Sequence, residues 1–177
     1  MKPRFFLRGA LLTAVGGLLS AFGASRDTVS PDKVYTACEV LQDLDALNKK
    51  VVIVRDVVVS GPHGSFLSGT CTSHIVKKGF EWPDIIWLKN PRDSKGPFEA
   101  DKKAHDQVRK EIVRLRLRPK DRLILTYVGT LETKDLAKSV EIRAGRLVPF
   151  GFGPDSDAPA QLIVKTVMDP QVLRDRE

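Results

Sequence analysis

The strongest strand signal in this chain is Val51-Val52-Ile53-Val54-Arg55-Asp56-Val57-Val58-Val59. Seven of its nine residues are β-branched and apolar, and so continuous a run is typical of a strand that is covered on both faces. The polar pair Arg55-Asp56 interrupts the run and indicates a bend or bulge, where one face of the strand passes from core to solvent. The segment predicts a long, coiled strand inside a β-rich domain.

Turn and strand signals follow this segment along the chain. Residues 60–64 predict a turn and residues 65–69 a partner strand, which together make a hairpin. Further strands are predicted over residues 84–89, 122–132 and 161–168. Asp169-Pro170 is expected to end the last strand, and residues 147–159, rich in Gly, Pro and Asp, are interpreted as a loop.

Two helices are predicted beside these strands. The first starts at Ser30-Pro31-Asp32, with Ser30 as its cap, and apolar residues at helical spacing continue to about residue 47. Asn48 is its expected stop, and Cys38 is placed on its buried face. The second covers residues 98–113, a polar segment with spaced apolar residues that is typical of a surface helix.

The order of these elements predicts a mainly β fold. Five strands with a helix between the third and fourth match the five-stranded Greek-key barrel called the OB-fold, here with an added N-terminal helix. We expect residues 34–170 to form this domain. A short linker over residues 24–33 precedes it, and a C-terminal tail over residues 171–177 follows it.

The first 23 residues are interpreted as a signal peptide. Lys2, Arg4 and Arg8 form a positive region, an uncharged run covers residues 9–19, and Ala21-Phe22-Gly23 puts small residues at the −3 and −1 positions of a cleavage site. The alternative is a membrane anchor, but a spanning helix needs roughly 20 apolar residues, and this run is shorter and contains glycines. We therefore predict a periplasmic or secreted protein that contacts the membrane only through this segment, if it is left uncleaved.

Removal of the signal lowers the formal charge. The whole chain carries +7, and residues 24–177 carry +4, because three basic residues and no acidic ones precede residue 24. A charge of +4 is an ordinary balance and argues against nucleic acid as the partner, since nucleic-acid binders usually gather basic residues on one face. We expect an envelope glycan, peptide or protein instead, and the sequence predicts no cofactor.

The two cysteines predict a disulfide. Cys38 and Cys71 are the only cysteines, and an even pair in an oxidising compartment is most simply a bridge. Metal binding is the alternative, because His74 follows Cys71 closely. That spacing supplies two ligands, whereas a zinc site needs three or four.

Short motifs in the chain resemble those of a family of exported bacterial OB-fold-like proteins of unknown function. Those proteins have a Cys-bearing helix, then a Leu-Asn-Gly-Lys turn and a Val-x-Val-Arg-Gly strand. The matching stretches here are Cys38-Glu39-Val40-Leu41, Leu47-Asn48-Lys49-Lys50, Val52-Ile53-Val54-Arg55-Asp56 and Ala158-Pro159-Ala160-Gln161-Leu162-Ile163-Val164. The resemblance implies the barrel but no catalytic residues. Lys49 and Asp56 replace glycines of the pattern, so we expect a different or strained turn at Lys49.

Four residues are predicted to contact a ligand: Trp82, Arg55, Phe66 and His63. Trp82 precedes Pro83 in a predicted loop and is the better candidate for exposure, whereas Trp87, within an apolar strand, is expected in the core. Aromatic side chains on or beside the second and third OB strands provide platforms for sugars or bases.

The enzymatic alternatives depend on polar residues near the same strands. Asp56, His63, Ser65 and Ser68 invite a Ser/His/Asp interpretation, but no Gly-x-Ser-x-Gly elbow exposes a nucleophile. A metal-dependent phosphodiesterase would use Asp56 or Glu81 as its carboxylate, with Arg55 and the arginines of residues 114–118 for phosphate. The arginines of residues 114–118 are equally typical of a solvated edge alternating with core leucines. The sequence favours a non-enzymatic binding domain, with phosphodiesterase activity or sequence-independent nucleic-acid binding as the alternatives.

Overall fold

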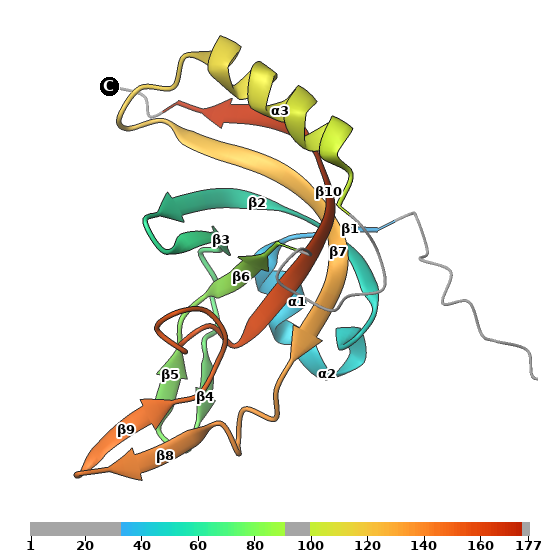
Figure 1. Ribbon diagram of the computed structural model, residues 1–177. Helices are drawn as coiled ribbons and strands as arrows, with labels where there is room; N and C mark the ends of the chain where they lie inside the picture. The colour runs from blue at the N-terminus through green and yellow to red at the C-terminus, as the bar shows by residue number, and fades with distance from the viewer. Residues whose placement is uncertain (1–32, 91–99, 175–177) are drawn as a thin grey trace, which may run out of the picture.

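The computed structural model describes residues 33–90 and 100–174, and it is mainly β (Figure 1). The predicted signal peptide and most of the linker lie outside the described residues. In chain order the elements are β1 (Val34–Tyr35), α1 (Ala37–Gln42), α2 (Leu44–Leu47), β2 (Val51–Gly61), β3 (Gly64–Ser68), β4 (Ile75–Lys77), β5 (Phe80–Trp82), β6 (Ile85–Lys89), α3 (Lys102–Leu115), β7 (Arg122–Thr133), β8 (Val140–Arg143), β9 (Arg146–Pro149) and β10 (Ala160–Leu173). None of the described helices is long and apolar enough to cross a membrane.

Six strands form one mixed sheet in the order β1-β2-β3-β6-β10-β7, and β2 also pairs with β7. The β6–β10 and β1–β2 pairs are parallel, and the other pairs are antiparallel. β4–β5 and β8–β9 are separate two-stranded hairpins, which extend together from one end of the sheet (Figure 1). The prediction of a mainly β protein is confirmed, and so are the predicted hairpin and the strands near residues 84–89 and 122–132.

The start of the first helix differs from the prediction. Val34–Tyr35 is not helical but pairs in parallel with Ile53–Val54. The helix begins at Ala37, because Thr36 and Glu39 form a capping box: the Thr36 hydroxyl accepts from the Glu39 N–H, and the Glu39 carboxylate accepts from the Thr36 N–H. This reciprocal pair satisfies two backbone donors, a stronger start signal than Ser30.

Arg55-Asp56 marks a change of strand partner and not a bulge. The β2–β7 register runs without a shift from Val51 to Val58. On its other edge β2 pairs first with β1 and then, from Val57 onward, with β3. Between the two partners the Asp56 carboxylate accepts hydrogen bonds from the N–H groups of Ala37, at 2.9 Å, and Val57, at 2.8 Å. Asp56 therefore joins β2 to the start of α1.

The end of β10 and the turn at Lys49 also depend on backbone geometry. Asp169-Pro170 does not end β10: the register with β7 shifts between Met168 and Gln171, and pairing resumes up to Leu173. A bulge accommodates the proline, which cannot donate to the ladder.

The expectation of an unusual turn at Lys49 is confirmed, because its φ of 61° lies in the left-handed region.

The hairpins β4–β5 and β8–β9 were not predicted, and the second replaces part of the expected loop over residues 147–159. Both use two-residue turns with positive φ, Lys78-Gly79 (52° and 79°) and Ala144-Gly145 (49° and 75°). Two such residues define the type I′ turn that matches the twist of a hairpin. A Cβ added to Gly79 would lie 3.8 Å from Leu147 Cδ1, so the two hairpins touch.

The core lies on the inward face of the sheet, where α1 and α2 cover it. Val54, Leu67, Ile86 and Leu162 are fully buried there. Tyr127 of β7 shares this interior, and burial raises the pKa of its phenol to about 12.

The helix predicted for residues 98–113 begins later, at Lys102, because the Asp101 carboxylate caps it by accepting from the Ala104 N–H. α3 packs on β10 through its buried Val108, and the Asp101 N–H donates to the Lys165 carbonyl of β10.

Candidate functional site

A groove of about 870 Å³ lies between the α1–α2 segment, β4 and the chain that follows β7. We call it the α2–β4 groove. Its volume falls in the range that accommodates small ligands or peptide segments. The lining residues are Leu41, Gln42, Asp43, Leu44, Asp45, Asn48, Ser73, His74, Ile75, Val76, Lys77, Thr133, Lys134, Asp135, Leu136 and Ala137.

The lining is apolar in part and carries charges of both signs. Leu41, Leu44 and Leu136 are buried side chains. Asp43 and Asp45 are exposed carboxylates of the α1–α2 wall. The exposed lining is therefore more polar than that of a typical small-molecule pocket, which is mostly apolar.

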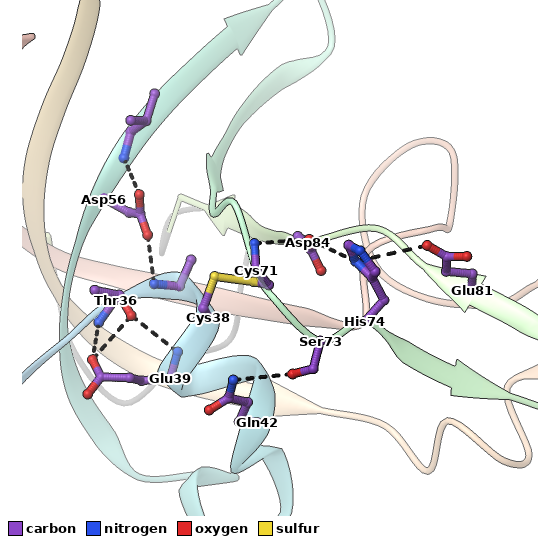
Figure 2. The surroundings of a disulfide bond; sticks show 12 residues. Thr36, Cys38, Glu39, Gln42, Asp56, Cys71, Ser73, His74, Glu81 and Asp84 are labelled. Carbon is purple, nitrogen blue, oxygen red and sulfur yellow. Dashed lines mark hydrogen bonds and ion pairs between the residues drawn. A yellow bond between two sulfur atoms is a disulfide. The ribbon is translucent and has the colours of Figure 1, made fainter.

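Two cross-links hold the α1 wall of the groove to the segment that leads into β4 (Figure 2). The predicted disulfide is confirmed: Cys38 of α1 is bonded to Cys71, with the Cα atoms 5.3 Å apart. One helical turn further on, the Gln42 side-chain amide donates to the Ser73 hydroxyl at 3.4 Å. Cys71 is buried and Cys38 is half-buried against the core, so the bridge fixes the spacing between these two walls.

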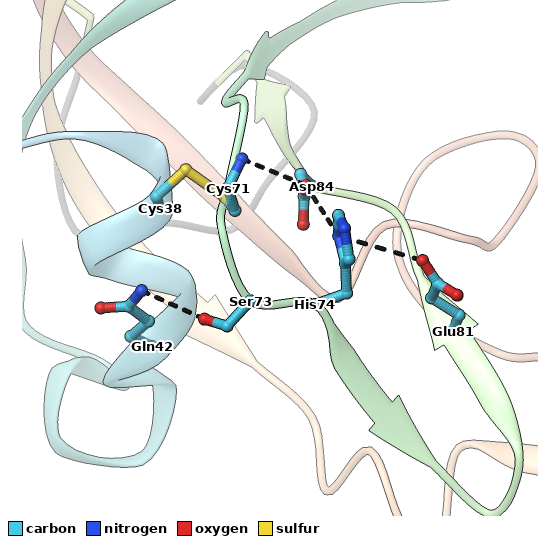
Figure 3. A network of polar contacts seen from close by, with 7 residues as sticks. All are labelled: Cys38, Gln42, Cys71, Ser73, His74, Glu81 and Asp84. Carbon is cyan, nitrogen blue, oxygen red and sulfur yellow. Dashed lines mark hydrogen bonds and ion pairs between the residues drawn. A yellow bond between two sulfur atoms is a disulfide. The ribbon is translucent and has the colours of Figure 1, made fainter.

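Asp84 organises the loop that carries Cys71 (Figure 3). Its carboxylate accepts from the Cys71 N–H at 3.4 Å, its carbonyl accepts from the Gly69 N–H at 3.0 Å, and its Oδ2 lies 3.0 Å from His74 Nδ1. His74 Nδ1 is also 3.9 Å from Glu81 Oε1. These contacts set the position of His74 at the edge of the groove.

The β4 strand contributes backbone as well as side chains to the groove. It pairs with β5 on one edge, with Lys77 opposite Phe80 and Val76 opposite Glu81. In a two-residue hairpin the residues next to the turn exchange the hydrogen bonds, and the following pair does not. The N–H and C=O of Val76 therefore point away from β5, at the edge that lines the groove, and the Val76 side chain is 57% exposed.

The two basic side chains of the groove have different surroundings. The Lys134 ammonium donates to the carbonyls of Phe150 and Gly151, at 2.7 Å each, and lies over the Phe152 ring, so it stabilises the loop after β9. Lys77 is exposed on β4. Asp135, on the same wall as Lys134, pairs with Lys138 at 2.9 Å, and this contact lowers the pKa of its carboxyl.

The structure reverses the predicted exposure of the two tryptophans. Trp82 is 1% exposed, because its ring packs edge-on against Phe80, with centroids 5.1 Å apart, and against Gly151, where an added Cβ would lie 2.8 Å from the ring. Trp87 is only half-buried. Trp82 is therefore a core residue of the β4–β5 hairpin and not a surface contact.

Phe66 and Trp87 are neighbours on the outward face of the main sheet. They lie directly opposite each other on β3 and β6, and Val59 of β2 lies opposite Phe66. The Trp87 ring covers Gly64, where a Cβ would come within 2.6 Å of it. His63 is exposed in the adjoining β2–β3 turn. Of the predicted ligand residues, Phe66 therefore lies near His63, whereas Trp82 lies apart from them in the β4–β5 hairpin.

Arg55 bonds within the fold: its guanidinium donates to the Thr126 hydroxyl at 2.6 Å and to the Asp169 carbonyl at 3.4 Å. Asp56, its neighbour on the strand, accepts two backbone N–H groups near α1. The two side chains point to opposite faces of β2, since successive residues of a strand alternate.

Two further candidate chemistries are not assembled in residues 33–90 and 100–174. No group of three or more His, Cys, Asp and Glu side chains is placed there to hold a metal ion. Cys71 is bonded to Cys38, which removes its thiolate as a partner for His74.

Sequence reasoning missed most of the groove because it missed β4. Lys78-Gly79, between two short segments with apolar residues, was the available signal for the hairpin. The approach of residues 133–137 to α2 had no local signal at all.

Comparisons of the chain with protein-family models, with curated proteins and with solved structures found no match.

Proposed function

We propose that this chain is an exported OB-like binding module, without enzymatic activity of its own, that holds an extended segment of another envelope protein in the α2–β4 groove. The observation that carries the proposal is the edge of β4. Its Val76 N–H and C=O face a groove of peptide size, and an extended peptide can add to such an edge as a further strand.

The OB-like part of the proposal is supported by the strand pairings. From β2 they run to β3, β6, β10 and β7, and β7 pairs again with β2. In chain order these five strands are β2, β3, β6, β7 and β10. The third and the fifth, β6 and β10, are parallel to each other, and α3 lies between the third and the fourth. A five-stranded Greek-key barrel has this order and this helix position.

Export is supported by two independent features. Residues 1–23 have the charge and apolar pattern of a signal peptide. The Cys38–Cys71 bridge suits an oxidising compartment.

Peptide binding is supported by the composition of the groove. The leucines of its lining can receive alternate side chains of a bound strand, while the exposed polar residues provide hydrogen-bond partners. Because the disulfide holds two of the walls together, little ordering is needed when a ligand binds, and preorganisation of this kind favours affinity.

A matched pair of variants tests this function. The disulfide-bonded chain is panned against a phage-displayed library of random dodecapeptides, and the affinities of the enriched peptides are measured by titration calorimetry. Val76→Pro, which removes the edge N–H, is expected to weaken binding at least tenfold, and Val76→Ala, which keeps it, by less than threefold. Peptides that bind both variants equally, or a library without enriched peptides, would contradict the proposal.

A second candidate, glycan binding, is favoured by the half-buried Phe66–Trp87 pair on the outward face of the sheet, since aromatic rings can stack on sugars. Soluble peptidoglycan fragments serve as the probe, with Phe66→Ala as the variant. If the fragments bind, and Phe66→Ala weakens their binding whereas Val76→Pro does not, the outward face and not the groove is the ligand site.

A further inference from the structure

Positive charge is concentrated in one short part of the chain. Residues 102–122, which include α3, the following turn and the first residue of β7, contain nine Lys and Arg but three Asp and Glu, a net charge of +6. Since residues 24–177 carry +4 in total, the rest of that region has a net charge of −2. The modest overall charge is therefore the sum of a strongly basic segment and a weakly acidic remainder.

The structure places most of these basic residues on one surface. The buried side of α3 is formed around Val108, which packs towards β10, so the polar residues of the helix face outward. Its exposed basic residues are Lys102, Lys103, Arg109, Lys110 and Arg114, and its exposed acidic residues are Asp106 and Glu111. Arg116 and Lys120, also exposed, continue the charge into the turn. We call these residues the α3 surface.

Part of this charge is neutralised locally. Arg118 lies 3.5 Å from Asp121, and the same carboxylate accepts the Arg118 N–H, which lowers the pKa of Asp121. Arg109, Lys110 and Arg114 form no ion pair among the described residues.

Apolar side chains are exposed between these basic residues. Val113 of α3 is 72% exposed, and Leu117 of the turn is 40% exposed, contrary to the prediction that leucines here alternate into a core. Leu173 is 42% exposed at the end of β10 and pairs with Arg122 of β7. In Figure 1 the end of α3, the turn and the end of β10 gather at one end of the molecule.

We propose that the α3 surface binds an anionic phospholipid bilayer. Lys and Arg are attracted to the headgroup phosphates, while exposed valine and leucine side chains insert at the boundary with the acyl chains. Nucleic acid would use the basic residues but not Val113 and Leu117, because recognition of single strands relies on aromatic stacking. In the described residues, α3 and its turn contain no Phe, Tyr or Trp.

This surface is separate from the α2–β4 groove and does not depend on it. It would place the protein at a membrane face and leave the groove accessible to a partner. The two proposals therefore fail independently: peptide binding can be lost without lipid binding, and the reverse.

Vesicle co-sedimentation tests the proposal. The full chain is mixed with vesicles of phosphatidylglycerol and phosphatidylcholine or of phosphatidylcholine alone, and the excess affinity for the anionic vesicles is measured. Binding to the neutral vesicles reports what the N-terminal segment contributes by apolar insertion. The triple variant Arg109→Gln, Lys110→Gln, Arg114→Gln is expected to lower the excess affinity roughly 100-fold. The control Lys50→Gln, Lys77→Gln, Arg146→Gln changes the net charge equally and is expected to lower it less than fivefold.

A second pair of variants separates a bilayer from a soluble polyanion. Val113→Ser is expected to weaken vesicle binding about fivefold, and Val76→Ser, at an exposed valine outside the α3 surface, to leave it unchanged. Three results would overturn the proposal: no excess affinity for anionic vesicles, equal losses in the two charge variants, or a Val113→Ser protein that binds as well as the wild type while heparin competes fully.

Discussion

The helices at the two ends of the sheet are attached to it in different ways. α1 is joined to its neighbours by a disulfide, by the Asp56 carboxylate at its first turn and by the Gln42–Ser73 contact. Within the described residues, α3 is capped by Asp101, whose N–H donates to β10, and it packs against the sheet through the buried Val108 and the partly buried Ile112. The first helix is cross-linked around a groove, whereas the second rests on the sheet and presents charge outward.

A fixed geometry and a concentration of charge are therefore found in separate parts of the described structure. A groove that recognises a segment of chain needs walls at a constant spacing, which the covalent bridge supplies. A surface that is attracted to a charged sheet of headgroups needs basic side chains that are free to adapt, and extra cross-links would not improve it.

Loss of the disulfide has the largest expected effect. The chain-entropy model gives about 3–4 kcal/mol for a bridge of sequence separation 33, so Cys38→Ser with Cys71→Ser should lower the free energy of unfolding by about that amount in urea titrations. Hydrogen exchange should accelerate in α1 and in residues 69–77 and stay unchanged in α3. Equal acceleration in both helices would contradict the view that the bridge acts on the groove end.

Removal of the apolar anchor of α3 comes second. Val108→Ala should cost about 2 kcal/mol of unfolding free energy, because a buried side chain is truncated and a cavity remains. Val113→Ala on the same helix should change it by less than about 0.5 kcal/mol, because that side chain is already exposed. Similar losses in thermal and urea unfolding of the two variants would show that α3 is not attached through Val108.

The helix caps have the smallest expected effect. Thr36→Ala should cost about 1 kcal/mol, and Asp101→Ala a similar or smaller amount, since the first removes half of a reciprocal pair and the second a single acceptor.

The effect at α1 should also depend on pH. The hydrogen bond from the Thr36 N–H lowers the pKa of Glu39 below 4.5. For a lowered pKa the stabilisation is present above the unfolded value and is lost as the pH falls through the folded value. The destabilisation caused by Glu39→Ala, which removes this carboxylate, should therefore shrink in acid. An unchanged difference from the wild type in urea titrations at low pH would rule out the capping carboxylate as its origin.

Local sequence patterns were sufficient for much of the sheet. The apolar run at Val51–Val59, the alternation over residues 122–132 and the turn before Ser65 each predicted a strand or hairpin that the structure contains, because backbone preference and burial act there within a few residues. The left-handed backbone at Lys49 and the Cys38–Cys71 bridge were also predictable.

The candidate sites were less predictable because they depend on contacts between distant segments. Trp82 precedes a proline and Trp87 lies within an apolar strand, and these local sequences predicted the opposite of the burial that the structure has. One is buried because Gly151, almost 70 positions further on, allows its ring to approach, and the other lies on the outward face because of its register with Phe66. The wall formed by residues 133–137 had no local pattern that could place it beside α2.

Composition and short-range periodicity were enough to predict the strand-rich class, the pairing of the two cysteines and the total charge. The surface on which the charge gathers, the burial of Trp82 and the backbone edge that lines the groove depend on tertiary contacts. Those properties arise when residues far apart in the chain share one surface. The free energy of that packing depends on contacts between segments, so it cannot be read from any one segment alone.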